Sequence, residues 1–599
     1  MVGIRECGLF FISIAILGFP GLAFAQEPSL DLEPIVVSKA GVHLLNSYAV
    51  ESDELKDFSG SPLEALSLLP LDLQSRSLKG GIQSDFSLRG SNYQGVLLLV
   101  NGQRINDPQT GHHNSDIPFT SADIERSEVI PGIGSSLFGP DAIGGAINII
   151  LKEPAKRRVV ADLSAGQYQS KAALFSVEEK QGKAGLRFSL ERQESEGFRY
   201  DTDFKESTAS LSSSYDIPDG KFFANLGYQD KEFGAYDFYT PASGYPSKEW
   251  TQTYLIDTGV NLDKGDWIIK PNFLWRRHFD KFMLDKTEVR TRYLNHHRTD
   301  LLTPSVYFQK QLGDLGKTGL GLEYGQERLD STNLGKDVRS HKSIFMDNAK
   351  ELDCGLDIGS SLRVDDYDGF REALSGSLSL RYRLRQYNSL HLGVSRSLRV
   401  PSFTELYYND PTTLGNPGLS SENALNYQAG YDYKRKDLAA GITFFIREEE
   451  EMIDWVKQQP GQAKWQAENI TQDQVKGVEG YLKIDFNQQL SLSSNYSYVD
   501  KRVNKQGYLY KYGQNYFRHL INTDLTLKLP FGTQTVSAVY KKRPQRDGWF
   551  LLNTRFSYDL NKNSRLFLEI SNLLNVEYQE IAGIPQPGRW VEAGLRFEW

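Results

Sequence analysis

Alternation of apolar and polar residues runs through most of the chain, from Ala155 to Trp599. In the clearest example, Leu374 to Leu384, apolar or small residues occupy the even positions, and Ser or Arg the odd ones. Successive side chains of a strand point to opposite faces, so a period of two indicates strands with one apolar and one polar face. Roughly twenty-two such segments, at about twenty residues per strand and loop, predict a large all-β transmembrane barrel of antiparallel strands.

A soluble sandwich or propeller is the alternative fold for such alternation. A propeller requires a repeated blade signature, and the sequence contains none. Beyond the N-terminus, no apolar run approaches the roughly 18 residues that a spanning helix needs. The last segment, Trp590 to Trp599, is amphipathic, with Leu595, Phe597 and Trp599 on one face. This ending favours the barrel.

Two glycine-rich stretches precede the alternating region. Ile124 to Leu151 ends in an apolar run, Ala146 to Leu151, which is short enough to be a buried strand. Phe86 to Asp107 contains an apolar strand, Val96 to Val100, followed by Asn-Gly, which is a strong hairpin signal. Together these stretches predict a small α/β unit.

The two stretches resemble the plug domain of TonB-dependent outer-membrane transporters. Ser87-Leu88-Arg89-Gly90 is similar to a plug motif of that family, with Leu in place of Ile. Asn572-Leu573-Leu574-Asn575 and Pro587-Gly588-Arg589 are similar to its C-terminal motifs. The resemblance implies an N-terminal α/β plug, residues 45–152, inside a barrel of residues 153–599. It also implies the outer membrane of a Gram-negative-type bacterium, with outer-membrane lipid and the barrel-assembly machinery as partners.

The N-terminus has two further predicted parts. Residues 1–25 have the apolar core and the Ala-Phe-Ala end of a secretory signal peptide. Residues 26–44 would form a periplasmic N-terminus, in which a β-prone island resembles the TonB box of the family. The resemblance implies that TonB, energised by ExbB and ExbD, binds this island as an added strand; an ordinary first strand is the alternative. The island comprises Glu33, Pro34, Ile35, Val36, Val37, Ser38 and Lys39.

Candidate substrate-binding residues lie in loops. In the family, the loop between the plug motifs rises to the extracellular side and touches substrate. Two long barrel loops, Phe233 to Trp250 and Val400 to Ser420, are rich in Tyr, which suits a large amphipathic ligand. Their aromatic residues could instead line the rim or form the membrane-interface girdle. The candidates are Gln109, Thr110, His112, His113 and Asn114 in the plug loop and Tyr236, Tyr239, Tyr245, Trp250, Tyr407 and Tyr408 in the barrel loops.

Two features point to metal ions. Adjacent histidines, as in His112-His113 and His296-His297, point apart on an extended chain, so a pair seldom supplies two ligands to one ion. One histidine of the plug loop could bind a metal or a metallated ring. Calcium is held by oxygen ligands in loops, and cobalamin receptors of the family bind it with loop aspartates. The best matches here are Asp201, Asp203 and Asp237; no other cofactor is expected.

Composition and missing motifs exclude several function classes. A formal net charge of −8 argues against a nucleic-acid partner, which requires a concentrated basic face. The sequence has no Walker phosphate loop, zinc-protease helix or hydrolase elbow, so no enzyme is predicted. A passive porin would lack both plug and box, and an adhesin without energised transport would not need the box.

The resemblance therefore implies TonB-dependent active uptake of a scarce, bulky nutrient in the form of a small-molecule metal chelate. The compact barrel most resembles the cobalamin receptors of the family, which implies cobalamin or another corrinoid as cargo. Haem and ferric siderophores are the rivals. Haem receptors carry a His between motifs that correspond here to Arg399 and to Asn416-Pro417-Gly418-Leu419, and that His is absent.

Overall fold

The computed structural model of the protein describes residues 47–599, except 53–62, 78–81, 133, 240–242, 288–292, 460, 504–506 and 514. The predicted signal peptide and TonB box lie outside the described residues. The described residues of the plug and the barrel belong to one compact unit. None of the helices in the described ranges is both long and apolar enough to cross a membrane.

The plug is built on a five-stranded sheet in the order β1-β6-β7-β4-β5, in which β4 and β7 are parallel. The predicted hairpin joins β4 to β5. Its Asn101 and Gly102 have φ of 51° and 76°, because a type I′ turn requires positive φ at both positions. The elements are β1 (Tyr48–Glu51), β4 (Val96–Val100), β5 (Gln103–Arg104), β6 (Ile124–Pro131) and β7 (Gly145–Leu151), with the separate hairpin β2 (Asp72–Ser75) and β3 (Ser84–Ser87), and the short helices η1 (Glu64–Leu68), η2 (Gly111–His113) and α2 (Ser135–Phe138).

Strand β4 is buried on both faces, which explains its uninterrupted apolar sequence. On one face Leu98 and Val100 join a cluster that includes residues of the barrel wall. On the other face Leu97 and Leu99 pack in a second cluster, with Phe138 of α2. The plug core is therefore shared with the barrel.

The barrel closes with 22 antiparallel strands, as predicted, when the last strand pairs with the first. Two short strands, β21 (Thr413–Leu414) and β26 (Leu509–Tyr510), lie in its loops, with α3 (Phe403–Tyr407) and η3 (Gly313–Leu315). The barrel strands are β8 (Arg158–Gly166), β9 (Lys171–Gln181), β10 (Ala184–Ser195), β11 (Phe204–Ile217), β12 (Gly220–Gly234), β13 (Lys248–Lys264), β14 (Trp267–Met283), β15 (Leu294–Gln311), β16 (Lys317–Ser331), β17 (Gly335–Leu352), β18 (Leu356–Tyr367), β19 (Ala373–Arg385), β20 (Asn388–Arg399), β22 (Glu422–Arg435), β23 (Leu438–Lys457), β24 (Trp465–Asp485), β25 (Leu490–Val503), β27 (His519–Leu529), β28 (Gly532–Lys542), β29 (Trp549–Asn561), β30 (Ser564–Ser571) and β31 (Trp590–Glu598).

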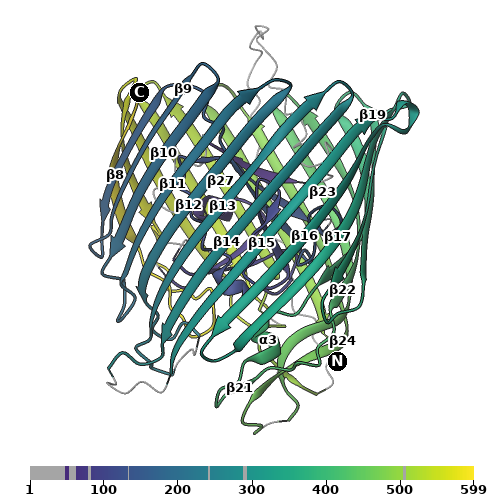
Figure 1. Ribbon diagram of the computed structural model, residues 1–599. Helices are drawn as coiled ribbons and strands as arrows, with labels where there is room; N and C mark the ends of the chain where they lie inside the picture. The colour runs from purple at the N-terminus through teal and green to yellow at the C-terminus, as the bar shows by residue number, and fades with distance from the viewer. Residues whose placement is uncertain are drawn as a thin grey trace, which may run out of the picture. The chain divides into compact units, whose positions relative to one another are not determined.

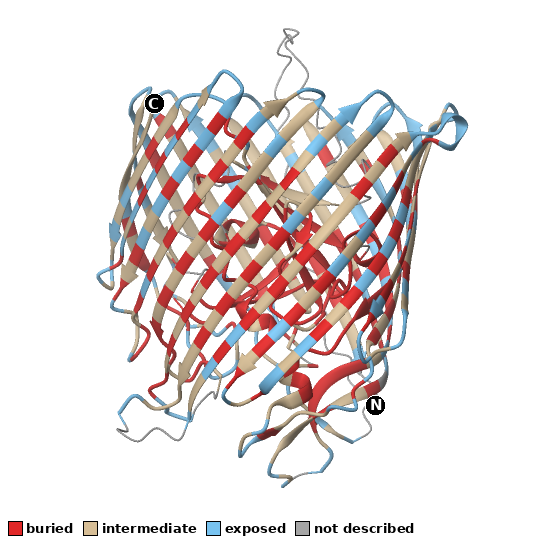
Figure 2. Ribbon diagram, viewed as in Figure 1, coloured by how far each residue is buried: buried red, intermediate tan, exposed pale blue. Residues whose placement is uncertain are grey.

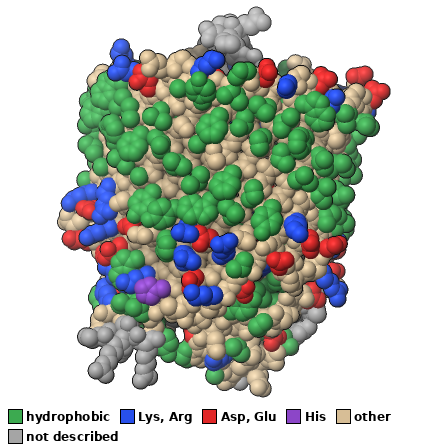
Figure 3. Space-filling view, viewed as in Figure 1, with side chains coloured by type: hydrophobic (Ala, Val, Ile, Leu, Met, Phe, Trp, Pro, Cys, Tyr) green, Lys and Arg blue, Asp and Glu red, His purple; other side chains and the backbone are tan. Residues whose placement is uncertain are grey.

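The usual burial pattern of a soluble protein is inverted in this wall. On β10, Leu186 and Leu190 are 51% and 43% exposed, whereas Arg187 and Ser189 between them are buried. Buried and more exposed residues alternate along the strands (Figure 2). The outward apolar side chains form a broad band over the strands in Figure 3, with charged residues below it. An apolar exterior and a polar interior are typical of a barrel surrounded by lipid.

The two ends of the barrel differ. At one end, at the top of Figure 1 beside the C-terminus, strands are joined by tight turns such as 182–183, 218–219 and 265–266. At the other end, which carries α3 and β21, the connections are longer, such as 235–247, 400–421 and 572–589. Outer-membrane barrels have short periplasmic turns and long extracellular loops. The end with α3 is therefore the extracellular end.

Buried ion pairs join the plug to strands distributed around the wall. Each pair combines one plug residue with one barrel residue, and every side chain involved is almost fully buried. The pairs are Arg89–Glu479 (2.7 Å), Arg104–Glu327 (2.6 Å), Asp123–Arg187 (3.0 Å), Asp116–Lys231 (2.8 Å), Asp107–Arg276 (2.6 Å) and Asp72–Arg543 (3.1 Å). Their partners on β10, β12, β14, β16, β24 and the 543–548 loop place the plug within the lumen.

Candidate functional site

The plug loop from Asp107 to Asp116 lies against the extracellular loops of the barrel. The carbonyl oxygens of Pro108 and Gln109 accept hydrogen bonds from the amides of Phe403 (2.9 Å) and Thr404 (3.1 Å) in α3. Thr110 accepts a hydrogen bond from the His112 amide at the start of η2. The predicted plug loop and the predicted loop 400–420 are thus in direct contact.

His112 lies in an aromatic cluster on the extracellular side of the plug. Its ring stacks on Tyr93 with centroids 4.0 Å apart, and the ring of Tyr239 lies 5.7 Å away. Tyr93 also makes an edge contact with Tyr512, at 5.1 Å. We call His112, Tyr93, Tyr239 and Tyr512 the apical aromatic cluster. It combines His112 of the plug loop and Tyr239 of the barrel loop 233–250 with two residues that the sequence did not single out.

An ion pair beneath this cluster fixes the orientation of His112. Nδ1 of His112 lies 2.7 Å from a carboxylate oxygen of Asp85, which also pairs with Arg76 at 2.6 Å. Burial would raise the pKa of Asp85, but the charge of Arg76 and the hydrogen bond with His112 hold it well below its usual range. Burial lowers the pKa of His112 despite the neighbouring carboxylate. The histidine is therefore neutral at pH 7 and its partner is ionised.

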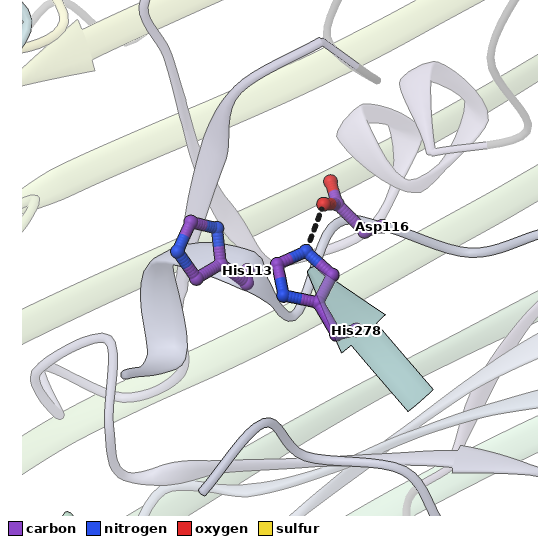
Figure 4. Close-up of side chains that lie close together, drawn as sticks. All are labelled: His113, Asp116 and His278. Carbon is purple, nitrogen blue, oxygen red and sulfur yellow. Dashed lines mark hydrogen bonds and ion pairs between the residues drawn. The ribbon is translucent and has the colours of Figure 1, made fainter. Parts of the chain in front are cut away.

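His113 points away from His112, although both lie in the 3-10 helix η2 and not on the extended chain that was expected from the sequence. Its ring lies 4.6 Å from that of His278 on β14, and its Nε2 lies 3.4 Å from Asp280. Figure 4 shows His113 beside His278, which bonds Asp116 at 2.8 Å. Burial would lower the pKa of His113, but the hydrogen bond and charge of Asp280 outweigh it and raise the pKa to about 9.

These residues form a buried cluster between the plug loop and the wall. It comprises His113 and Asp116 of the plug, Glu249 of β13, and His278 and Asp280 of β14. Glu249 accepts a hydrogen bond from the Tyr239 hydroxyl at 2.6 Å, which links this buried cluster to the apical aromatic cluster.

The other residues predicted to bind substrate do not form one site: some contact plug or wall residues, and others are exposed or lie on the outer face. Oδ1 of Asn114 accepts a hydrogen bond from the Asp107 amide, and the side chain of Gln109 lies 3.5 Å from Asp280. Trp250 alternates with buried Glu249 on β13 and therefore lies on the outer face, with Lys281 4.4 Å above its ring. This is the position that the girdle alternative requires. Tyr236 and Tyr407 are half-buried, as is Tyr408, whereas Tyr245 is 41% exposed.

Two of the three aspartates considered for calcium have other side-chain contacts, and the carbonyl oxygen of the third, Asp203, accepts a hydrogen bond from the Gly234 amide. Asp201 forms an ion pair with Lys286, and its carbonyl oxygen accepts a hydrogen bond from the Tyr236 amide. Oδ1 of Asp237 accepts a hydrogen bond from the Gly244 amide at 2.7 Å. A calcium ion would have to displace Lys286, so the calcium site stays a prediction.

Several residues of both clusters were missed from the sequence. Arg276, His278 and Asp280 occupy alternate positions on β14 and face the lumen together. Three polar side chains at a period of two on one strand were a usable signal. Their neighbours on the plug could not be identified in the same way, because contact between plug and wall depends on the closed barrel.

The plug and the barrel each match a profile of a known protein family. The plug-domain profile of TonB-dependent receptors matches residues 45–146, and the "TonB dependent receptor-like, beta-barrel" profile matches residues 166–573. The chain belongs to the TonB-dependent receptor family. Receptors of this family act with TonB and bind small-molecule substrates, and this receptor is a protein of the Gram-negative outer membrane.

Similar receptors have been named for two kinds of cargo. The vitamin B12 transporter BtuB of Vibrio vulnificus is 23% identical over 95% of this chain and 94% of its own. BtuB of Photobacterium profundum is 24% identical over 98% and 99%. The iron-regulated outer membrane virulence protein of Vibrio cholerae is 24% identical over 85% and 84%. Among solved structures, the siderophore receptor PiuA of Acinetobacter baumannii covers 96% of this chain and 99% of its own at a TM-score of 0.77 and 14% identity, which shows the shared fold.

Proposed function

We propose that this receptor performs the active uptake of a corrinoid, cobalamin or a close relative, across the outer membrane. The position of the plug supports active transport. Breaking a buried ion pair by removing one partner costs about 3–5 kcal/mol, and six such pairs join the plug to strands all around the wall. A bulky solute can pass only when some of these contacts are rearranged, which requires an energy source.

The proposed energy source is TonB, driven by ExbB and ExbD, which binds Glu33 to Lys39 as an added strand. The barrel-assembly machinery inserts the barrel, and no enzymatic step forms part of the proposal. Deleting residues 33–39 is expected to abolish accumulation of the nutrient in cells while binding to the purified receptor stays intact. Unchanged accumulation with intact binding would contradict energised transport.

Two observations support a corrinoid as the cargo. Two relatives that align over nearly the whole chain are named vitamin B12 transporters. The apical aromatic cluster offers rings with a polar atom at one end, which suits a large amphipathic ligand. Within the segment 400–421 the sequence contains no His that could bind haem iron. Calcium at Asp201, Asp203 and Asp237 would accompany the ligand, with Lys286 displaced.

An iron chelate is the second candidate, because the Vibrio cholerae relative described as iron-regulated also aligns over most of the chain. Titration of the purified receptor with cyanocobalamin, haem and ferric siderophores decides between them. We expect cyanocobalamin to bind most tightly, with a loss of affinity when Tyr93 is changed to Ala. Micromolar or weaker binding of cyanocobalamin beside tight binding of haem or a siderophore would overturn the assignment.

A further inference from the structure

The buried cluster between the plug loop and the wall contains two carboxylates that face one histidine. His113, Glu249 and Asp280 are 3%, 1% and 5% exposed, and each offers a ligand atom within 4.8 Å of the other two. Glu249 and Asp280 lie on adjacent antiparallel strands, where Asp280 is opposite Thr251, two residues from Glu249. This register places both carboxylates on the lumen face, next to η2.

The charged groups around Glu249 and Asp280 differ from those around the neighbouring carboxylates, Asp107 and Asp116. Asp107 pairs with Arg276 and Asp116 with Lys231, so each of those carboxylates has a permanent cation at hydrogen-bond distance. Glu249 instead accepts a hydrogen bond from the neutral hydroxyl of Tyr239. Asp280 faces His113 at 3.4 Å and His297 at 3.9 Å. The charge that faces the two carboxylates is the imidazole of His113, whose proton a metal ion would displace on binding.

Two buried polar atoms of this group lack a partner, although the His113 nitrogen that faces Asp280 is the other one, Nε2. Nδ1 of His113 and Oδ1 of Asp280 are buried and have no hydrogen bond within the part of the chain that the structure describes. Buried polar atoms of native proteins normally have a partner, so each exception calls for a missing ligand or water. Both atoms belong to the same three-residue group.

We propose that His113, Glu249 and Asp280 form a binding site for a divalent transition-metal ion that links the plug loop to the barrel wall. Imidazole nitrogen and carboxylate oxygen are both ligand types of Zn²⁺, and three protein ligands with a water as the fourth are a common arrangement. Ligand distances of about 2.0–2.2 Å require the three side chains to close slightly around the ion. The imidazole distinguishes this site from an oxygen-only calcium site.

A second set, His113, Asp116 and His278, shares the same histidine. There, Nε2 of His278 is already bonded to Asp116 at 2.8 Å, and the ammonium of Lys231 lies 2.8 Å from the same carboxylate. A metal ion would be repelled by that ammonium and would have to break the bond. The site with Glu249 and Asp280 meets neither obstacle.

The ion would join one plug residue to two wall residues near the extracellular end. A ligand that binds only the assembled state stabilises that state. A bound metal ion should therefore hold the plug loop in its observed position. Release of the ion, or displacement of one ligand, would free the loop. The site thus acts on the position of the plug, independently of which nutrient the receptor carries.

Zinc titration of the full-length receptor in detergent, after removal of metal with a chelator, tests the proposal. We expect one tightly bound equivalent of Zn²⁺ by calorimetry. His113→Asn, Glu249→Gln and Asp280→Asn should each weaken binding by at least tenfold, since loss of an outer-shell partner alone costs about 10–100-fold. His296→Asn is the matched control, because His296 is exposed and adjacent to His297 in sequence; its zinc affinity should equal that of the unaltered receptor.

Absence of zinc binding, or unchanged affinity in all three variants, would overturn the proposal. A difference in gel mobility between heated and unheated samples checks that each variant keeps a folded barrel. If a variant fails to fold, X-ray absorption of the zinc-loaded unaltered receptor decides: a shell with one imidazole and oxygen ligands supports the site, and a shell without imidazole contradicts it. These measurements contain no corrinoid, so their outcome is separate from that of the cargo titration.

Discussion

Arg89 shows at the residue scale what a plug motif does physically. Its guanidinium makes two hydrogen bonds with Glu479 of β24, at 3.0 and 2.7 Å, and a third with Gln428. It also lies 4.3 Å above the ring of Phe445. A bidentate pair of this kind has a defined direction as well as a favourable energy. The motif therefore orients the plug relative to β22, β23 and β24.

Replacing Arg89 with Met should lower the local stability of the plug by about 3–5 kcal/mol, because Glu479 would remain as an unpaired buried charge. The readout is hydrogen exchange of the β4 amides, which reports local opening. Arg192→Met is the control, since its ion pair is exposed and should contribute at most about 1 kcal/mol. The double change Arg89→Met with Glu479→Leu should restore most of the loss. Equal exchange in the Arg89 and Arg192 variants would contradict this role.

The pKa of His112 gives a second prediction at this scale. Burial lowers this pKa, so the unfolded chain takes up a proton at a higher pH than the folded one. The plug loop should therefore lose stability as the pH falls through about 6.5, the unfolded value. Histidine NMR in detergent should give a midpoint for His112 below that value, and Asp85→Asn should lower it further by removing the attracting charge. A midpoint at or above 6.5 would show that Asp85 outweighs burial.

At the scale of elements, the short helix α3 connects an extracellular loop to the plug. Ser402 and Glu405 form a capping box at its N-terminus, and Glu405 also pairs with Arg399 at 2.8 Å. The first two helical amides bond to plug carbonyl oxygens. Gln94 of the plug donates a further hydrogen bond to Ser402. The cap therefore stabilises the helix and the plug contact together.

Ser402→Ala should destabilise α3 by about 1 kcal/mol, the usual effect of losing such a cap. Hydrogen exchange should rise both at Phe403–Tyr407 and in the plug loop, because the two share hydrogen bonds. Ser421→Ala, on the same loop, is a suitable control. Faster exchange in α3 with no change in the plug loop would show that the two elements are not coupled.

At the scale of the whole molecule, the inverted wall determines where charge is tolerated. Leu378 lies near the middle of β19 and is 41% exposed on the outer face. Leu315 lies in the tight connection between β15 and β16 and is 66% exposed. Both leucines are accessible, but only the first lies on the apolar band of the wall.

Leu378→Arg should destabilise the barrel in lipid by about 2–4 kcal/mol, and Leu315→Arg by no more than about 1 kcal/mol. The measurement is the urea midpoint of folding into liposomes for each variant. Similar midpoints would show that Leu378 lies outside the hydrocarbon layer.

Local patterns in the sequence determined the strand type, the approximate strand number and the turn chemistry. The period of two is a property of neighbouring residues, and Asn101-Gly102 requires only its own dihedral angles. These features depend on short-range sterics and could be predicted.

Tertiary structure alone decided which lumen-facing side chains meet the plug. His113 and Asp280 are far apart in sequence, and their contact depends on strand register, barrel closure and the orientation of the plug. Each of these is a sum of many long-range contacts, which no single stretch of sequence contains. The paired histidines illustrate the division: the sequence predicted that they point apart, whereas the fold decided that His112 joins an aromatic cluster and His113 a group of buried carboxylates.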